Sequence, residues 1–325
     1  MSKTDVALGI DIGGTNTALG FVDRDGQCVL DSSILTHAEE DAPIFIGGLC
    51  AKIGEMYRTI QDKHLLKGIG IGAPNANYYR GTVENPPNLS WKGEVDVVGM
   101  VRKVYDLPVA ITNDANAAAI GEMTFGAARG MKDFVVITLG TGLGSGIVCN
   151  GLLVYGADGF AGEIGHTIVD PEGRDCGCGR RGCLETYASA GGICRTVLAL
   201  LAQRRTESEL RIVAPAHLTA KMIAAAANRG DAVALEAFEA TGRILGLKLA
   251  DTIAHTSPEA IFLFGGLANA GELIFSPTRR HMELHLLGIL KGKVRLLPSG
   301  LKEVNAAVLG AAALIWNELR SGKGV

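Results

Sequence analysis

Short apolar runs that end in glycine and polar residues dominate the chain, and they predict buried strands alternating with helices. The runs 6–11 and 17–22 flank a Gly-Gly-Thr-Asn turn, which is a hairpin pattern. The runs 134–140 and 147–156 flank the turn TGLGSG and repeat this strand–turn–strand layout. Two copies of one layout indicate two similar α/β halves.

The remaining elements follow from the same pattern. We expect further strands at 28–35, 67–74, 108–114 and from residue 259. We expect helices at 44–64, 97–106, 115–128, 304–319 and over most of 189–256. The segments 75–96 and 156–188 have no regular period and are expected to be irregular. No linker rich in proline, serine or charge is present, so we expect the chain to pass between the halves more than once.

Composition narrows the function classes. The 325 residues suffice for two domains, and 47% hydrophobic residues argue against a disordered chain. The balance of 31 basic and 34 acidic residues, without a polybasic block, argues against nucleic acid and anionic membranes as partners. No apolar run could span a bilayer and no signal-peptide pattern is present, so we expect a cytoplasmic protein with reduced thiols. The 44 glycines cluster beside apolar runs, which indicates loops whose backbone contacts a ligand.

Three glycine-containing turns are candidate phosphate-binding sites, because glycine lets backbone amides approach an anion. Each turn alone is also compatible with an ordinary hairpin or helix-entry turn, but two at the heads of matching hairpins are more specific. The segment 68–73 loosely fits a dinucleotide fingerprint, and we reject that site because Pro74 and a loop follow it instead of a helix. The candidate nucleotide-binding residues are Asp11, which could hold Mg²⁺ through water, and Gly13, Gly14, Thr15, Asn16, Gly140, Thr141, Gly142, Gly144, Gly265 and Gly266.

A cysteine-rich segment predicts a metal site. Three thiols and one imidazole form a Cys₃His set, which is typical of structural zinc, and the neighbouring glycines allow the tight turns that a metal loop needs. The alternative is a group of unrelated thiols in a reducing cytosol. The predicted ligands are His166, Cys176, Cys178 and Cys183, whereas Cys28, Cys50, Cys149 and Cys194 are expected in the core.

Two polar pairs are candidates for catalysis and substrate binding. Asn113 and Asp114 come at the start of the alanine-rich helix, whose dipole favours an ionised carboxylate on Asp114. This carboxylate could accept a hydroxyl proton during phosphoryl transfer, although an aspartate at this position is also a common helix cap. Glu163 and His166 are three residues apart and could share one wall of a pocket.

The motif order D-x-G-G-T, N-D-A-N, G-T-G-x-G and F-G-G resembles the ROK family of sugar kinases, which belongs to the actin/hexokinase/Hsp70 ATPase superfamily. The resemblance covers nearly the whole chain and includes the cysteine segment. It implies an α/β fold of two actin-like lobes, built from ribonuclease H-like halves, with a ligand cleft between the lobes. We expect a small lobe of residues 1–112 and 304–325 and a large lobe of residues 113–303 that contains the zinc segment 166–183.

The resemblance also implies an activity. We expect an ATP- and Mg²⁺-dependent hexose kinase that phosphorylates O6 of glucose, a glucokinase of glycolysis, with Asp114 matching the family's catalytic base. One ring nitrogen of His166 would bind zinc and the other would face a sugar hydroxyl. A homodimer is expected because dimers are common in the family. The sugar-binding residues implied by the resemblance are Asn88, Asn113, Asp114, Glu163, His166 and Glu185.

Several alternatives stay open. The segment NPPNLSW resembles glucokinases of the family more than its amino-sugar kinases, but N-acetylmannosamine, N-acetylglucosamine, fructose and allose remain alternative substrates, and polyphosphate could replace ATP. The family also includes sugar-responsive repressors with an N-terminal helix-turn-helix, for which the position of Asp11 leaves no room. A sugar-binding protein without catalysis is the third class, and the retained Asp114 and glycine turns argue against it.

Overall fold

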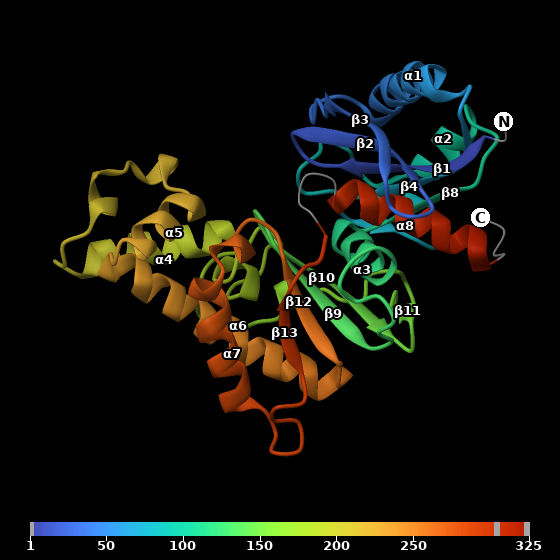
Figure 1. Ribbon diagram of the computed structural model, residues 1–325. Coiled ribbons are helices and arrows are strands. Elements are labelled where there is room, and N and C mark those ends of the chain that lie inside the picture. The colour runs from blue at the N-terminus through green and yellow to red at the C-terminus, as the bar shows by residue number, and fades with distance from the viewer. Residues whose placement is uncertain (1–2, 302–305, 322–325) are drawn as a thin grey trace. The chain divides into compact units, whose positions relative to one another are not determined.

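The computed structural model describes residues 3–301 and 306–321, which form two compact units (Figure 1). The chain leaves the first unit after Met131 and Ala161 and returns to it after Leu152 and Pro298. It therefore crosses more than once, as expected from the lack of a linker. How these units correspond to the lobes 1–112 with 304–325 and 113–303 stays a prediction, and residues 304–305 and 322–325 lie outside the described part.

The sheet of the first unit has the strand order β3-β2-β1-β4-β8. Its first three strands in sequence are antiparallel neighbours, whereas β1, β4 and β8 run parallel. The strands are β1 (Thr4–Ile12), β2 (Asn16–Asp23), β3 (Cys28–Leu35), β4 (His64–Gly72) and β8 (Val109–Thr112). Each of them overlaps an apolar run from which a strand was predicted.

The sheet of the second unit has the equivalent order β11-β10-β9-β12-β13. Again the first two strands form an antiparallel hairpin, and β12 runs parallel to both β9 and β13. The strands are β9 (Phe134–Leu139), β10 (Leu143–Cys149), β11 (Leu152–Leu153), β12 (Ala260–Phe264) and β13 (Arg295–Pro298). The shared strand order confirms the predicted α/β fold with two similar halves.

The helices are distributed over both units. Those of the first unit are α1 (Ala42–Ile60), α2 (Val97–Arg102), α3 (Asp114–Thr124) and α8 (Ala306–Ser321). Those of the second are α4 (Ala190–Gln203), α5 (Ala220–Asn228), α6 (Ala232–Thr256) and α7 (Glu272–His285). Short 3₁₀ helices are η1 (Ile164–His166), η2 (Leu184–Thr186), η3 (Glu209–Ile212), η4 (Pro215–His217) and η5 (Ala268–Ala270). None of the helices in the described ranges is both long and apolar enough to cross a membrane.

Two expectations about local structure were wrong, and one strand was missed. The segment 75–96 is not wholly irregular, because it contains a small antiparallel sheet of β5 (Ala76–Asn77), β6 (Thr82–Glu84) and β7 (Glu94–Val95). The turn TGLGSG is shorter than expected, because β10 already begins at Leu143. The strand β13 was not predicted. Strands of two to four residues, such as β5 and β13, and glycine-rich strands carry too little apolar periodicity to be recognised.

The alternation of side chains along β1 explains how the first unit is layered. Val6, Leu8 and Ile10 belong to the apolar core that includes α1, whereas Ala7 belongs to the core that includes α8. Successive residues of a strand point to opposite faces, so the large residues face α1 and the small ones face α8.

Glycines on that second face let α8 approach the sheet closely (Figure 1). A Cβ atom on Gly9 would lie 2.1 Å from the carbonyl oxygen of Val308, and one on Gly70 would lie 1.8 Å from that of Ala311. The glycines of the rejected dinucleotide fingerprint therefore serve helix packing. The close contact places the β1–β2 turn and the start of α3 on a rigid base.

Candidate active site and metal centre

The turn between β1 and β2 carries the first set of predicted nucleotide-binding residues. The Gly13 amide donates a hydrogen bond to the Asn16 carbonyl over 3.1 Å, and the side chains of Thr15 and Asn16 are exposed. A Cβ atom on Gly14 would lie 2.8 Å from Cβ of Asn88. The structure thus brings Asn88, which only the family resemblance had suggested, next to this turn.

The start of α3 positions the predicted catalytic base. Asn113 is the N-cap, and its side-chain oxygen accepts a hydrogen bond of 2.8 Å from the Ala115 amide. Asp114 is the first residue of the helix and its Oδ1 accepts from the same amide, also over 2.8 Å. Capping occupies the oxygen of the Asn113 amide group and leaves its NH₂ group as a donor.

The pKa values of both Asp11 and Asp114 are raised, and the charge of Asp114 contributes to the shift of Asp11. Desolvation by burial, and after it the negative charge of Asp114, raise the pKa of Asp11 from 3.8 to about 7. Desolvation by the surrounding protein atoms also raises the pKa of Asp114, although part of this residue is exposed to solvent. The hydrogen bond from the Ala115 amide opposes this shift. Two neighbouring carboxyl groups whose charged forms are both disfavoured fit the neighbourhood of a divalent cation, which would stabilise both carboxylates.

In the second unit, the turn between β9 and β10 is built around Glu185. The Leu143 amide donates a hydrogen bond of 3.0 Å to Oε2 of Glu185. A Cβ atom on Gly142 would lie 2.2 Å from the same oxygen, so a larger residue there would displace the Glu185 carboxylate from this position. Gly144 lies in β10 itself, and Thr141 is exposed at the turn.

The Gly-Gly pair after β12 lies beside the same turn. Gly265 has a φ of +100°, and its Cβ position would be 2.8 Å from the carbonyl oxygen of Leu139, the last residue of β9. Gly266 has open space within 4 Å of its Cβ position. Two of the three predicted nucleotide turns therefore lie together in the second unit.

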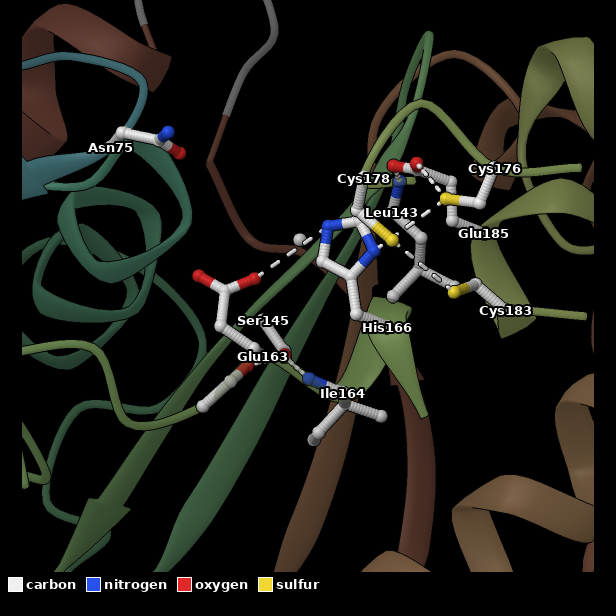
Figure 2. A network of polar contacts seen from close by, with 12 residues as sticks. Asn75, Leu143, Ser145, Glu163, Ile164, His166, Cys176, Cys178, Cys183 and Glu185 are labelled. Atoms are coloured by element: carbon white, nitrogen blue, oxygen red, sulfur yellow. Dashed lines mark hydrogen bonds and ion pairs between the residues drawn. The ribbon is translucent and has the colours of Figure 1, made fainter. Parts of the chain in front are cut away.

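The predicted metal ligands come together at one point (Figure 2). The ligand atoms of His166, Cys176, Cys178 and Cys183 all lie within 4.8 Å of one another. Sγ of Cys178 is 3.6 Å from Sγ of Cys183, and Sγ of Cys176 is 3.7 Å from Nδ1 of His166. Zinc with Zn–S bonds of about 2.3 Å separates tetrahedral sulfur ligands by about 3.8 Å, so this donor set fits the ion.

Local structure and electrostatics support the metal loop. A Cβ atom on Gly182, which has a φ of +70°, would lie 1.6 Å from the carbonyl oxygen of Asp170, so only glycine permits this turn. Desolvation tends to raise the pKa of Cys178, but hydrogen bonds from Arg180 and from the other thiols outweigh it and lower this pKa to about 6. Desolvation raises the pKa of Cys176 to about 12. The surroundings of Cys178 therefore favour its thiolate, which is the form that binds a metal.

The predicted sugar-binding residues of the second unit surround this centre. Nδ1 of His166 faces the cysteines, while its Nε2 lies 4.0 Å from Oε2 of Glu163 (Figure 2). Oε1 of Glu185 lies 3.6 Å from Sγ of Cys176. One nitrogen of His166 thus faces the cysteines and the other faces Glu163, and the predicted contact with a sugar hydroxyl stays a prediction.

Sequence reasoning missed Arg174, which holds the segment carrying Glu185. Its guanidinium donates to the carbonyl oxygens of Thr186 (2.7 Å) and Gly192 (3.0 Å) and lies 4.4 Å from the ring centroid of Tyr187. It thereby fixes η2 to the start of α4. The one signal in the sequence was a single arginine between the histidine and cysteine ligands, which is indistinguishable from an exposed charge.

The predicted site residues divide between the two units. The first unit brings together Asp11, Gly13, Gly14, Thr15, Asn16, Asn88, Asn113 and Asp114. The second brings together Gly140, Thr141, Gly142, Gly144, Glu163, His166, Cys176, Cys178, Cys183, Glu185, Gly265 and Gly266. Residues 7–318 match the model of the ROK family. The chain belongs to the ROK family.

Individual ROK proteins resemble this chain over most of its length. A glucokinase of Halalkalibacterium halodurans is 36% identical over 285 residues, which cover 86% of each chain. The crystal structure of a ROK family glucokinase from Streptomyces griseus in complex with glucose and AMPPNP superposes with a TM-score of 0.81 at 34% identity, covering 95% of this chain and 98% of that one. A xylose repressor of Bacillus subtilis is 29% identical over 315 residues, which cover 96% of this chain and 77% of the repressor.

Proposed function

We propose that this ROK protein is an ATP-dependent glucose kinase that phosphorylates O6 of glucose. The observation that carries this proposal is the pair Asp114 and Asp11, because a carboxylate at a helix N-terminus beside a second carboxylate suits both proton acceptance and Mg²⁺ binding. The similarity to glucokinases, one of them in complex with glucose and AMPPNP, supports glucose as the acceptor.

In the proposed reaction O6 attacks the γ-phosphorus of ATP while the bond between this phosphorus and the ADP oxygen breaks. The O6 proton passes to the Asp114 carboxylate. Asn88 and Asn113 in the first unit, and Glu163, His166 and Glu185 in the second, would hold the sugar hydroxyls. The glycine turns would bind the nucleotide through their amides, and Mg²⁺ would offset negative charge on the transferring phosphoryl group.

We further propose that His166, Cys176, Cys178 and Cys183 hold a structural zinc ion. The short distances among the four ligand atoms support this zinc site. Zinc would rigidify the loop that contains His166 and so fix the direction in which Nε2 of His166 faces the sugar. All four positions would be protein ligands, which suits a structural rather than a catalytic ion. The homodimer stays a prediction.

Replacing Asp114 by asparagine tests the kinase proposal. The amide preserves the shape but cannot accept the proton, so kcat should fall about 10²–10⁴-fold while glucose still binds. ADP release in a coupled assay gives kcat, and calorimetric titration gives glucose affinity. Asp96→Asn is a matched control, because Asp96 also begins a helix of the first unit, as the N-cap of α2. An Asp114→Asn variant that keeps more than about a tenth of wild-type kcat would exclude this base.

The similarity to a xylose repressor favours one second candidate, a sugar-responsive regulator without catalysis. A panel of glucose, fructose, xylose and N-acetylated hexosamines separates the two. Sugar binding without ADP release from the wild type would support the regulator and refute the kinase.

A further inference from the structure

The buried hydroxyl of Ser145 makes hydrogen bonds with backbone groups on both sides of Glu163. Ser145 lies in β10, and its hydroxyl donates a hydrogen bond to the carbonyl of Gly162. The same oxygen accepts a hydrogen bond of 3.3 Å from the amide of Ile164. Figure 2 shows Ser145 beside Ile164, with Glu163 between the two backbone groups that the hydroxyl contacts.

Glu163 itself is the central residue of a tight turn. Its φ of −75° and ψ of 53° are close to those of an inverse γ-turn, and the Ile164 amide also donates to the Gly162 carbonyl over 2.8 Å. A three-residue turn has only this one hydrogen bond of its own. The Ser145 hydroxyl contacts both ends of that bond and so closes the turn from outside.

The loop around this turn lies directly on β10. A Cβ atom on Gly162, which has a φ of +95°, would lie 3.2 Å from the carbonyl oxygen of Ser145. One on Gly165 would lie 2.1 Å from the carbonyl oxygen of Leu143. The backbone of β10 therefore determines where the loop runs, and the Ser145 hydroxyl determines how the turn within it is oriented.

We propose that Ser145 is a positioning residue that locks the turn at Glu163 and thereby aims its carboxylate at the sugar and at Nε2 of His166. The proposal rests on the proposed sugar kinase function. It differs from a nucleotide role, which the glycine-rich motif around Ser145 would suggest from the sequence alone. Ser145 is only 6% exposed, and both hydrogen bonds of its hydroxyl go to the backbone groups of Gly162 and Ile164 on either side of Glu163.

Kinetics of Ser145 variants provide the first test. In Ser145→Ala two backbone groups lose their hydroxyl partner, so glucose KM should rise about 5- to 30-fold, while ATP KM and zinc content stay within about twofold of wild type. Ser145→Thr keeps the hydroxyl and should restore glucose KM to within about threefold. Thr219→Ala is the matched control, because Thr219 caps α5 of the same unit by accepting from a backbone amide over 3.2 Å. Equal rises in glucose and ATP KM, or no rescue by threonine, would overturn the proposal.

A double-mutant cycle with Glu163→Gln asks whether Ser145 acts through Glu163. If it does, Ser145→Ala should raise glucose KM by less than about threefold in the Glu163→Gln background, because the aimed carboxylate is already gone. Effects that multiply in the double variant would overturn the proposed route, since a residue of purely structural importance gives independent losses.

Amide hydrogen exchange gives a readout that does not depend on the activity. Exchange in the peptide 160–167 should speed up at least about fivefold in Ser145→Ala and remain unchanged in Thr219→Ala. Unchanged exchange in Ser145→Ala would overturn the positioning role. If the wild type does not phosphorylate glucose but the Ser145→Ala variant still shows faster exchange in this peptide, the result would refute the proposed function and not the positioning role.

Discussion

Glu122 is a fully buried carboxylate near the end of α3, the helix that begins with Asp114, and its replacement by glutamine should strongly destabilise the first unit. Oε1 of Glu122 accepts from the Gly300 amide over 2.9 Å and from the hydroxyl of Ser299. Oε2 accepts from the Ala127 amide over 2.8 Å. The carboxylate thus ties α3 both to the turn that follows it and to the segment before α8.

The size of the effect follows from the number of donors. An amide group has one accepting oxygen, so in Glu122→Gln the new NH₂ group must face at least one backbone N–H. The variant loses a charge-assisted hydrogen bond and leaves a buried donor unpaired, which should cost about 2–4 kcal/mol. For a domain of this size, 1 kcal/mol corresponds to a Tm shift of about 2–4 °C, so Tm should fall by about 5–15 °C.

Thermal unfolding followed by calorimetry and circular dichroism measures this shift. Glu259→Gln is the matched control, since Glu259 accepts from the Lys132 amide over 2.9 Å but is exposed, so water can replace the lost hydrogen bond. Its Tm should change by less than about 2 °C. Shifts of equal size in the two variants, or a shift below about 2 °C in Glu122→Gln, would refute the reasoning from buried donors.

Three further predictions concern charge, packing and the metal. The pKa of Asp11 is raised from 3.8 to about 7 in the folded protein. The protonated carboxyl group therefore contributes its full stabilisation below about pH 3.8, and this contribution is lost as the pH rises through about 7. In the absence of Mg²⁺, the Tm of Asp11→Asn should therefore rise relative to the Tm of the wild type as the pH increases from about 5 to 8. A difference in Tm that does not change with pH would contradict the raised pKa. Gly70→Ala should lower the free energy of unfolding in urea by at least about 1–3 kcal/mol, because Ala311 leaves no space for a methyl group. Gly48→Ala, which has open space on α1, should raise it by about 0.5–1 kcal/mol. Similar values for the two variants would disprove the packing argument. Metal analysis should find about one zinc ion per wild-type chain and much less in Cys178→Ser, and a metal-free wild type of full thermal stability would exclude structural zinc.

The sequence was most informative where the chemistry is local. Strands with strong apolar runs, such as those at 6–11 and 134–140, were predicted because nearly every residue of such a strand is buried, so the run itself is apolar. The metal ligands were predicted because His166 and the three cysteines lie within one short segment. Asp114 was predicted to lie in the first turn of its helix, and it does, because the Asn113 cap is itself a local signal.

The sequence was least informative where a residue's partner is distant. The glycines of β4 resembled a nucleotide fingerprint, and only the structure shows that α8 packs against them. Oε1 of Glu122 makes its hydrogen bonds with residues more than 170 positions away, and a lone glutamate in an alanine-rich helix was the only hint of a buried partner set. Ser145 was read as part of a turn, because serine and glycine carry almost no strand propensity.

The glycine-lined contact between α8 and the first sheet also has a consequence for biosynthesis. The strands of that sheet are made early, but the face formed by Ala7, Gly9 and Gly70 stays uncovered until residues 306–321 have left the ribosome. The second unit, whose own core needs only residues between 132 and 298, has all its parts before then. The N-terminal unit is therefore completed last, in contrast to chains whose domains fold in the order in which they are synthesised.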